Sequence, residues 1–333
     1  IKTKLLIISD THGLRDAKLP QLSADVAIHC GDLTEESKLE EFRTTLQLLQ
    51  AIDAPLKLVI AGNHDFTLDE SVYRQKAKEL LALSGPNNHD EDSELIKKVY
   101  GDYGEARSLL TAPAAIRQHG IHFLDEGTHH FTLANGGQLC VYASPFTPSL
   151  GDWGFQYHQA KGHNFELRRG TDISITHGPP RGILDRTDGR ERAGCPRLFT
   201  AVARSQPRIH CFGHIHEGWG AKLVAWGEDV SKCGAGLSDS KEEPSHLTAI
   251  NNGESCVIEA LSTLQRGKFD DEDTARTKEL KARKSSEQRY CGASLGSGSS
   301  KQQTLFVNGA IQAKDGGPPQ YTWLVEIDLM RAE

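Results

Sequence analysis

Five short motifs combine histidine, aspartate and asparagine, which are residue types that bind divalent metal ions. They are Asp10-Thr11-His12, Gly31-Asp32, Gly62-Asn63-His64-Asp65, Thr176-His177-Gly178 and Gly213-His214-Ile215-His216. Carboxylate and amide oxygens mixed with imidazole nitrogens suit borderline ions such as Mn²⁺, Fe²⁺ or Zn²⁺, whereas Ca²⁺ prefers a cage of oxygen ligands alone. The motifs therefore predict a site for borderline divalent metal ions.

The number of candidate ligands indicates two metal ions rather than one. The set contains more donors than a tetrahedral site takes: Asp10, His12, Asp32, Asn63, His177, His214 and His216. A carboxylate can bridge two ions that lie about 3.5–4 Å apart, and this arrangement is common in phosphoryl chemistry. Asp32 is the natural bridging residue.

Each motif follows a short apolar run that is typical of a buried strand. The clearest runs in the chain are Leu5–Ser9, Val26–Cys30, Leu56–Ala61, Leu139–Ala143, Ile173–Thr176 and Ile209–Phe212. In open α/β sheets, the loops after the C-terminal ends of strands converge on one edge without interrupting strand pairing. We therefore predict an α/β fold in which separate strand ends bring the ligands together.

The segments between these strands predict helices and a hairpin. Ser37 and Glu40 have the spacing of a capping box, which predicts a helix between the second and third strands. Residues 84–94 are expected to form a loop, and Asn135-Gly136 a hairpin turn. Further helices are expected at residues 69–83 and 105–117, and strands at residues 121–143, 305–310 and 321–329.

In kind and in order, the five motifs resemble those of the calcineurin-like metallophosphoesterases, which are D-x-H, G-D, G-N-H-[DE], H and G-H-x-H. The resemblance implies a two-sheet sandwich flanked by helices, an αββα arrangement. It implies that Asp10, His12, Asp32 and His216 hold a first metal ion, and that Asp32, Asn63, His177 and His214 hold a second. Mn²⁺ is the ion we expect first, with Fe²⁺, Zn²⁺ or Ni²⁺ as alternatives.

The resemblance also implies roles for two residues that are not ligands. His64 is expected to contact the scissile phosphate and assist the leaving group, and Asp65 to orient the His64 imidazole by a hydrogen bond. Two divalent ions lower the pKa of a bridging water, so that a metal-bridging hydroxide exists near neutral pH and attacks the phosphate in line. We therefore expect an enzyme, a phosphodiester hydrolase.

Shorter segments narrow the resemblance to a small-phosphodiesterase branch that includes class III cyclic-nucleotide phosphodiesterase-like proteins. They are Ser144–Pro148, Gly151–Gln156, His177–Pro180, Gly194-Cys195, Gly213–Glu217 and Phe306–Ala310. A fungal phosphopantetheinyl hydrolase of this branch is similar in size and layout, which implies a phosphopantetheinylated carrier protein as partner and substrate. A cyclic nucleotide or another small phosphodiester is the alternative. Arg181, Trp153 and Phe155 are expected to contact the substrate.

Composition, net charge and the retained ligands argue against several other classes of function. The chain has 333 residues and a formal net charge of −7, which argues against the broad basic face of a protein that binds nucleic acid, and so against a nuclease. A non-catalytic scaffold with this fold is a further alternative, but such proteins are expected to have lost metal ligands. The apolar start of the chain is too short for a signal peptide, and we expect no membrane segment.

Cysteine usage and local composition predict the compartment and the domain organisation. Seven cysteines occur without any C-x-x-C pair, so we expect free thiols in a reducing, cytoplasmic compartment. Residues 1–333 are expected to form a single domain. Within it, residues 220–304 are rich in charge and poor in apolar periodicity, which predicts a long insertion that is partly flexible.

Overall fold

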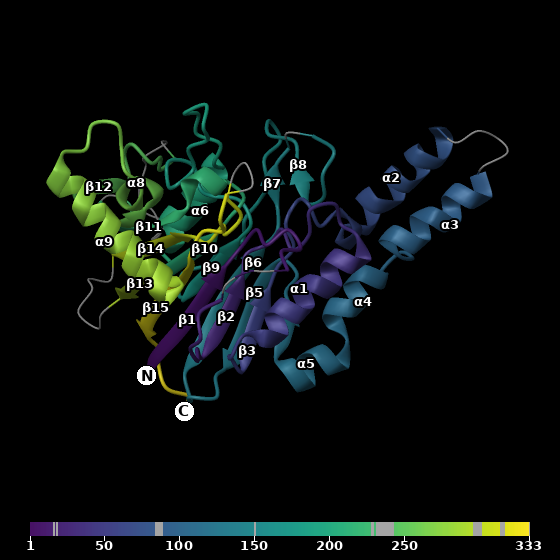
Figure 1. The fold of residues 1–333 in the computed structure, drawn as a ribbon, viewed down its shortest axis with the longest axis horizontal. Coiled ribbons are helices and arrows are strands. Elements are labelled where there is room, and N and C mark those ends of the chain that lie inside the picture. The colour runs from purple at the N-terminus through teal and green to yellow at the C-terminus, as the bar shows by residue number, and fades with distance from the viewer. Residues whose placement is uncertain are drawn as a thin grey trace.

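The first of two large sheets is built around parallel strands from the N-terminal part of the chain (Figure 1). In the computed structural model its order is β13-β15-β1-β2-β3-β4. Its strands are β1 Lys2–Ile8, β2 Val26–His29, β3 Leu56–Val59, β4 Ile121–Phe123, β13 Tyr290–Leu295 and β15 Thr322–Asp328. The structure describes the chain except residues 16, 18, 84–88, 150, 228–229, 231–242, 296–301, 314–316 and 333.

The second sheet has the order β12-β11-β14-β10-β9-β6-β5. Its strands are β5 Gly127–Thr132, β6 Gln138–Ser144, β9 Ile173–Thr176, β10 Ile209–Phe212, β11 Gly220–Trp226, β12 Ile250–Ala260 and β14 Gln303–Asn308. Strands β6, β9, β10 and β14 run parallel. A separate pair joins β7 Thr147–Pro148 to β8 Gln156–Tyr157.

Helices lie outside the two sheets, and two of them, Glu70–Leu83 and His89–Tyr100, project away from the sandwich as a pair (Figure 1). The helices are α1 Leu39–Ala51, α2 Glu70–Leu83, α3 His89–Tyr100, α4 Glu105–Thr111, α5 Pro113–His119, α6 Pro196–Ser205, α8 Leu261–Leu264 and α9 Glu272–Gln288, with short 3₁₀ turns η1 Phe66–Leu68 and η2 His216–Gly218. No helix among the described residues is long and apolar enough to cross a membrane.

Successive side chains of β1 point to opposite faces, so this strand contributes to two hydrophobic cores. Leu5 and Ile7 point to the side where the two sheets meet, in a cluster that also holds Ile175 of β9 and Cys211 of β10. Leu6 and Ile8 point the other way, into the cluster beneath α1. Because successive side chains of a strand face opposite sides, a run of apolar residues is what a strand buried on both faces needs. The expected αββα sandwich is confirmed.

Four local predictions need correction. Lys38, not Ser37, precedes the first turn of α1, and Glu41 accepts a hydrogen bond from the Lys38 backbone N–H at 3.0 Å. The helix expected over residues 105–117 is two helices, divided at Ala112 because Pro113 begins α5. Residues 89–94 of the expected loop belong to α3, whereas residues 84–88 lie outside the described residues.

The fourth correction concerns the strands predicted over residues 121–143. The hairpin of β5 and β6 is antiparallel, as expected around Asn135-Gly136. Strand β4, however, pairs in parallel with β3 and so belongs to the other sheet. An alternating pattern gives the same signal in both sheets, so only tertiary pairing decides which sheet the strand joins.

Residues 220–304 contain regular elements wherever the structure describes them. Strands β11 and β12 extend one end of the second sheet, and β11 pairs with β14 along its whole length. Strand β13 adds a parallel edge to the first sheet beside β15. The glycine and serine tract continues into residues 296–301, which lie outside the described residues. Division into a domain and an insertion stays a prediction.

The cysteines in the described part of the chain are free thiols, as expected: Cys30, Cys140, Cys195, Cys211, Cys256 and Cys291. Cys233 lies outside the described residues. Burial raises the pKa of Cys291 to about 11. Burial, together with a hydrogen bond that the Cys30 thiol donates to Cys211, holds the pKa of Cys30 well above its usual range. These two thiols therefore remain protonated and unreactive at neutral pH.

Two histidines inside the sheets occupy equivalent places. The His29 ring in β2 lies 2.9 Å from the Thr11 hydroxyl, and the His210 ring in β10 lies 2.9 Å from the Thr176 hydroxyl. Both rings are buried, and burial lowers the pKa of each from 6.5 to about 3. Each imidazole is thus neutral and supports a threonine that stands next to a predicted metal ligand.

Lowering the pH should reduce the free energy of unfolding through the buried rings of His29 and His210. Each folded-state pKa lies below the unfolded value, so the unfolded chain binds more protons once the pH falls under about 6.5. At pH 5 the loss in the free energy of unfolding should be on the order of 2 kcal/mol per ring. We expect His210→Gln to flatten the fall of Tm between pH 6.5 and 5. Replacing the exposed His130 by Gln should leave the slope as in the parent, and equal slopes for all three proteins would contradict this account.

Candidate metal centre

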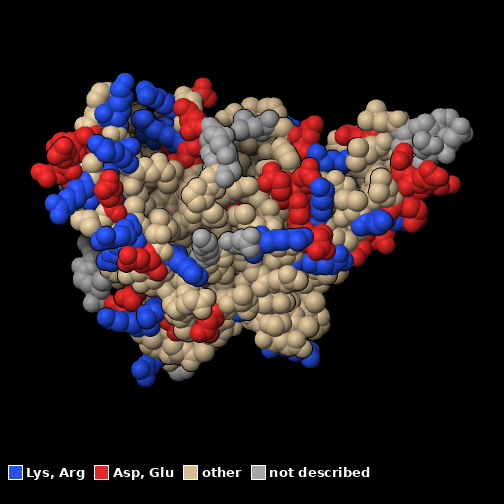
Figure 2. Space-filling view, in the orientation of Figure 1, with Lys and Arg blue, Asp and Glu red and all other residues tan. Residues whose placement is uncertain are grey.

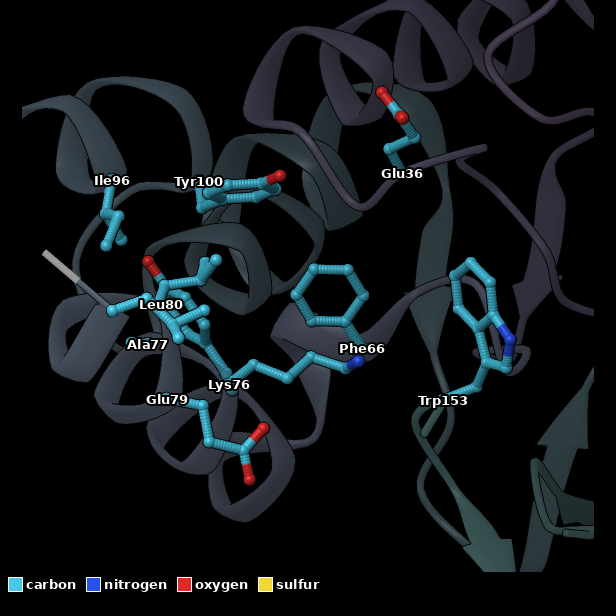
Figure 3. Close-up of a pocket in the computed structure, with 11 residues that line it drawn as sticks. Glu36, Phe66, Lys76, Ala77, Glu79, Leu80, Ile96, Tyr100 and Trp153 are labelled. Atoms are coloured by element: carbon cyan, nitrogen blue, oxygen red, sulfur yellow. The ribbon is translucent and has the colours of Figure 1, made fainter. Parts of the chain in front are cut away.

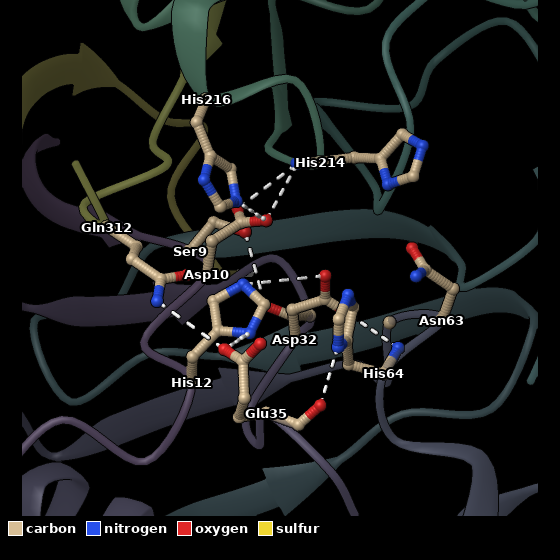
Figure 4. A network of polar contacts seen from close by, with 12 residues as sticks. Ser9, Asp10, His12, Asp32, Glu35, Asn63, His64, His214, His216 and Gln312 are labelled. Carbon is tan, nitrogen blue, oxygen red and sulfur yellow. Dashed lines mark hydrogen bonds and ion pairs between the residues drawn. The ribbon is translucent and has the colours of Figure 1, made fainter. Parts of the chain in front are cut away.

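The loops after β1, β2, β3, β9 and β10 meet at one edge of the sandwich, where the five motifs come together (Figure 4). Parallel strands point their C-terminal ends the same way, so residues remote in sequence become neighbours here. The His214 backbone N–H donates to both carboxylate oxygens of Asp10, at 3.0 and 3.1 Å, across 204 positions of the chain. This bond links the first sheet to the second at the site.

Three groups of ligand atoms form at this edge, each within 4.8 Å; one of them, His12 with Glu35 and His64, shares His12 with the first of the other two. The first contains Asp10, His12 and His216, and the second contains Asp32, His177 and His214. They correspond to the two sets that the family resemblance implies. Asn63 joins the second group through its Oδ1, which lies 2.9 Å from His177 Nε2.

Asp32 stands between the two groups. Its Oδ2 lies 3.2 Å from His177 Nε2 in one group and 3.7 Å from His12 Nε2 in the other. Its Oδ1 accepts a hydrogen bond from the His64 backbone N–H at 2.8 Å, which fixes the orientation of the carboxylate. This position is the one that a bridging ligand needs.

The donor set fits cations. Asp10 and Asp32 are 0% and 2% exposed, and burying ionised carboxylates is unfavourable unless positive charge compensates them. His12 Nε2 is buried and has no hydrogen-bond partner, so one ligand nitrogen at the centre is free to bind. Oxygen and nitrogen donors converge without a thiolate among them, which suits Mn²⁺, Fe²⁺ or Zn²⁺.

Electrostatics couple the two carboxylates to the histidines. Burial alone would raise the pKa of Asp10, but a hydrogen bond and the charge of His216 bring it down to about 2. Burial alone would lower the pKa values of His12 and His177. The hydrogen bond that His12 donates to Glu35 and the charge of Asp32 raise the pKa of His12 to about 9. The charge of Asp32 raises the pKa of His177 to about 9. In the absence of a cation, protons on these two rings therefore balance the carboxylates.

The turns that present the ligands are in a backbone conformation that glycine prefers. Asp10, His12, Asp32 and His214 have φ angles of +54°, +44°, +52° and +67°. Left-handed conformations of other residues cost about 1–3 kcal/mol each, and they cluster at functional sites. The strand pairing on either side holds these turns in place. The stability of the folded sheets therefore offsets the conformational cost of the left-handed ligand residues.

Two motif glycines leave space for carboxylates. A Cβ on Gly62 would lie 2.2 Å from Asp32 Oδ1, and one on Gly213 would lie 1.9 Å from Asp10 Oδ2. Both contacts are far inside van der Waals distance. Glycine stands at these positions because each aspartate packs directly against the backbone of the neighbouring motif.

The imidazole of His64 lies beside the first group. Its ring centroid is 4.8 Å from that of His12 and 4.2 Å from that of Trp153. Its Nδ1 lies 2.6 Å from the Glu35 carbonyl oxygen. A carbonyl oxygen can only accept, so Nδ1 carries the hydrogen and Nε2 is the nitrogen that remains for a substrate.

The hydrogen bond expected from Asp65 to the His64 ring is wrong. Asp65 is buried and instead accepts from the backbone N–H groups of Leu33, Thr34 and Gly62, at 3.1, 3.0 and 2.8 Å, and from the Thr34 hydroxyl at 2.7 Å. Its carboxylate thus ties the loop after β2 to the loop after β3. The backbone of Glu35, not Asp65, orients the His64 imidazole.

Glu35 is the site residue that the sequence did not reveal. Its Oε2 lies 3.1 Å from His12 Nδ1, and its own side chain is half exposed. The hydrogen bond to His12 lowers the pKa of Glu35 to about 2, so it is ionised throughout the neutral range. An acid in a polar loop has no distinctive pattern, so no local signal in the sequence singles out Glu35.

The three residues expected to contact substrate lie at different distances from this centre. The Trp153 ring lies against the His64 ring at an interplanar angle of 31°. Phe155 packs against the core beneath α1 and donates its backbone N–H to Asp69 at 3.0 Å. The charge of Arg181 acts on His246, and among the described residues no hydrogen bond or ion pair joins its side chain to the metal centre. Only Trp153 touches a residue of the centre directly.

The substitution Gly62→Ala should disturb the metal centre by a steric clash. The added methyl group would displace Asp32, so we expect Gly62→Ala to weaken Mn²⁺ binding at least about tenfold. Titration calorimetry on folded protein measures the affinity. Gly189→Ala is the matched control, because a Cβ there meets no atom closer than 3.7 Å. Unchanged affinity in Gly62→Ala would show that the close packing of Asp32 is not required.

Metal binding should become tighter as the pH rises. His12 and His177 have pKa values of about 9, and each must lose its proton before it binds a metal ion. Between pH 6 and 8 we expect the Mn²⁺ association constant of each site to rise roughly tenfold per pH unit for each proton displaced. Calorimetry in buffers of different ionisation enthalpy measures the protons released. Affinity that does not vary with pH would refute the exchange of protons for metal.

Comparison with known proteins identifies a family and several relatives. Residues 3–218 match the family of calcineurin-like phosphoesterases. The human metallophosphoesterase domain-containing protein 1 is 34% identical over 224 residues, which are 66% of this chain and 62% of that protein. A probable rhamnogalacturonate lyase C from Emericella nidulans is 30% identical over 226 residues, 67% of this chain and 18% of that protein. The chain thus spans less than two thirds of the length of these relatives.

Among solved structures, a purple acid phosphatase from yellow lupin seeds aligns with 68% of this chain and 39% of its own. The TM-score is 0.30 and the sequence identity is 13%.

Proposed function

Since the chain belongs to the calcineurin-like phosphoesterase family, we propose that it hydrolyses phosphodiesters with the help of two divalent metal ions. The observation that carries the proposal is the place of Asp32, whose Oδ2 lies within 3.7 Å of a histidine nitrogen in each ligand group. One carboxylate shared by two sets of donors is the arrangement of a two-metal phosphoesterase centre.

Two divalent cations, when bound, supply a nucleophilic oxygen near neutral pH and neutralise charge on the phosphate group. The chain holds them with Asp10, His12, Asp32 and His216 on one side, and with Asp32, Asn63, His177 and His214 on the other. No nucleophilic serine or cysteine is needed. Mn²⁺ is our first choice, and Fe²⁺, Zn²⁺ and Ni²⁺ suit the same donors.

His64 is the group that we assign to the leaving oxygen. Its Nδ1 is held by the Glu35 carbonyl, so its Nε2 keeps a constant direction. A positioned imidazole contributes about 10²–10⁴ in rate when it donates a proton or a hydrogen bond to a developing oxyanion. Asp65 acts indirectly, because it fixes the two loops that carry Asp32 and His64.

The substrate class is proposed from the resemblance of shorter segments. A phosphopantetheinylated carrier protein is one candidate, and a cyclic nucleotide is the other. Incubation of the Mn²⁺-loaded protein with each, followed by mass measurement of the products, separates them. Release of phosphopantetheine supports the first candidate, and opening of the cyclic phosphate supports the second.

Two other classes of function are less well supported. A non-catalytic scaffold would be expected to lack ligands, whereas all seven predicted ligand positions are filled here. A nuclease would need a continuous basic surface. On the face in Figure 2, basic and acidic side chains are interspersed, and acidic ones gather near the outer end of α3, where Asp90, Glu91 and Asp92 form the first turn.

Substitutions at the centre should separate metal binding from catalysis. We expect Asp32→Ala and His214→Ala to abolish hydrolysis of bis(p-nitrophenyl) phosphate and to lower the bound metal measured by elemental analysis. His64→Ala should keep the metal and lose about 10²–10⁴ in kcat. His130→Ala, an exposed site on β5, is the control and should behave like the parent. Full activity in Asp32→Ala would overturn the proposal.

A further inference from the structure

An aromatic pocket opens next to His64, between α2, α3 and the loop that carries Trp153 (Figure 3). Its volume is about 370 Å³, within the range of small-molecule sites. The residues that line it are mostly apolar, and we refer to it as the Trp153 pocket: Glu36, Phe66, Tyr73, Lys76, Ala77, Glu79, Leu80, Leu83, Ile96, Tyr100 and Trp153. None of these except Trp153 belongs to a segment that the family motifs include.

Three links join the Trp153 pocket to the metal centre. The Trp153 ring contacts the His64 ring in a tilted arrangement, with the centroids 4.2 Å apart and an interplanar angle of 31°, and it also lines the pocket. Phe66 follows His64 by two positions and stands in the middle of the pocket. Glu36 follows Glu35, whose carbonyl holds the His64 ring. The pocket therefore adjoins the His64 side of the metal centre through the Trp153 ring.

The walls of the Trp153 pocket are suited to a flat ring. Phe66 lies 5.7 Å from Tyr100 and 6.4 Å from Tyr73 between ring centroids, so the floor is a group of aromatic faces and edges. Tyr73 and Ala77 are almost fully buried at the base, whereas the Trp153 side chain is 36% exposed at the rim. Aromatic groups stack favourably on such surfaces and remove them from water.

A single cation stands at the junction between the pocket and the centre. Lys76 Nζ lies 5.3 Å from the centroid of the Phe66 ring and 5.8 Å from that of Trp153. Its ammonium group lies over the aromatic faces while its alkyl chain adds to the apolar wall. Glu36 and Glu79 also line the rim, so the pocket has an apolar interior with charges of both signs at its edge.

We propose that the Trp153 pocket binds an aryl or similarly flat apolar group on the leaving alcohol of the phosphodiester. The inference rests on the proposed function, because His64 is taken to face the leaving oxygen. A cyclic nucleotide carries a flat ring and a phosphopantetheine arm does not, so the pocket favours the nucleotide-like class. Binding in this pocket determines which diester is preferred rather than how the phosphate is cleaved.

A pair of diesters tests the proposal. Methyl phenyl phosphate and methyl 4-biphenylyl phosphate release phenols of nearly equal acidity, so a difference in kcat/KM reports the extra ring. With the Mn²⁺-loaded protein we expect the biphenylyl ester to be preferred by about tenfold or more. Ile96→Trp, which fills the pocket from α3, should bring this ratio close to one and leave the rate on the phenyl ester unchanged. An unchanged ratio in Ile96→Trp would overturn the assignment.

Lys98→Trp is the matched control, because Lys98 lies on the same helix, is exposed and does not line the pocket. It should keep the preference of the parent. Loss of the preference in both variants would point to a general disturbance of α3 and would also overturn the assignment.

A binding measurement separates this inference from the proposed hydrolysis. Calorimetric titration of the metal-free protein with 4-hydroxybiphenyl should give a saturable heat in the parent and in Lys98→Trp, and none in Ile96→Trp. If neither diester is cleaved yet this pattern holds, the hydrolase proposal fails and the pocket assignment stands. No binding to any of the three proteins would overturn the pocket, even if diesters are hydrolysed.

Discussion

The structure depends on two carboxylates that are buried where the two sheets meet. Asp10 and Asp32 are almost fully enclosed, and an ionised carboxylate is unfavourable there unless positive charge lies close to it. Protons on His12 and His177 supply this charge in the absence of a cation, and we propose that divalent cations take their place. The sequence keeps glycine at positions 62 and 213 because the carboxylates need that space.

The rest of the sandwich holds these charged groups in a strained geometry. Left-handed turns at four ligand positions are stable only because β1, β2 and β10 are paired on both sides. Asp65 ties two of the loops together, and neutral His29 and His210 support the threonines beside the ligands. The energy for the site thus comes from apolar burial and strand pairing elsewhere in the molecule.

The proposed metal centre and the proposed substrate pocket are built from different parts of the fold. The centre is built from loops at the strand ends, whereas the Trp153 pocket is built from α2, α3 and a loop beyond β7. Trp153 connects the two, because its ring lies against that of His64. A fold of this kind can change its substrate by changing helices at the side while the centre stays as it is.

The sequence alone predicted the strands that carry the motifs and the seven candidate ligands, because buried strands and strand-end histidines leave local signals in the chain. The two-sheet class came from the family resemblance, and the strands β11, β12 and β13 within residues 220–304 were not predicted. It did not reveal Glu35, since an acid in a polar loop has no distinctive pattern, and it assigned Asp65 to the wrong partner. It could not place β4 in the correct sheet or split the helix at Pro113. Tertiary structure decided these matters, because each depends on which remote segment packs beside a residue and not on the residue itself.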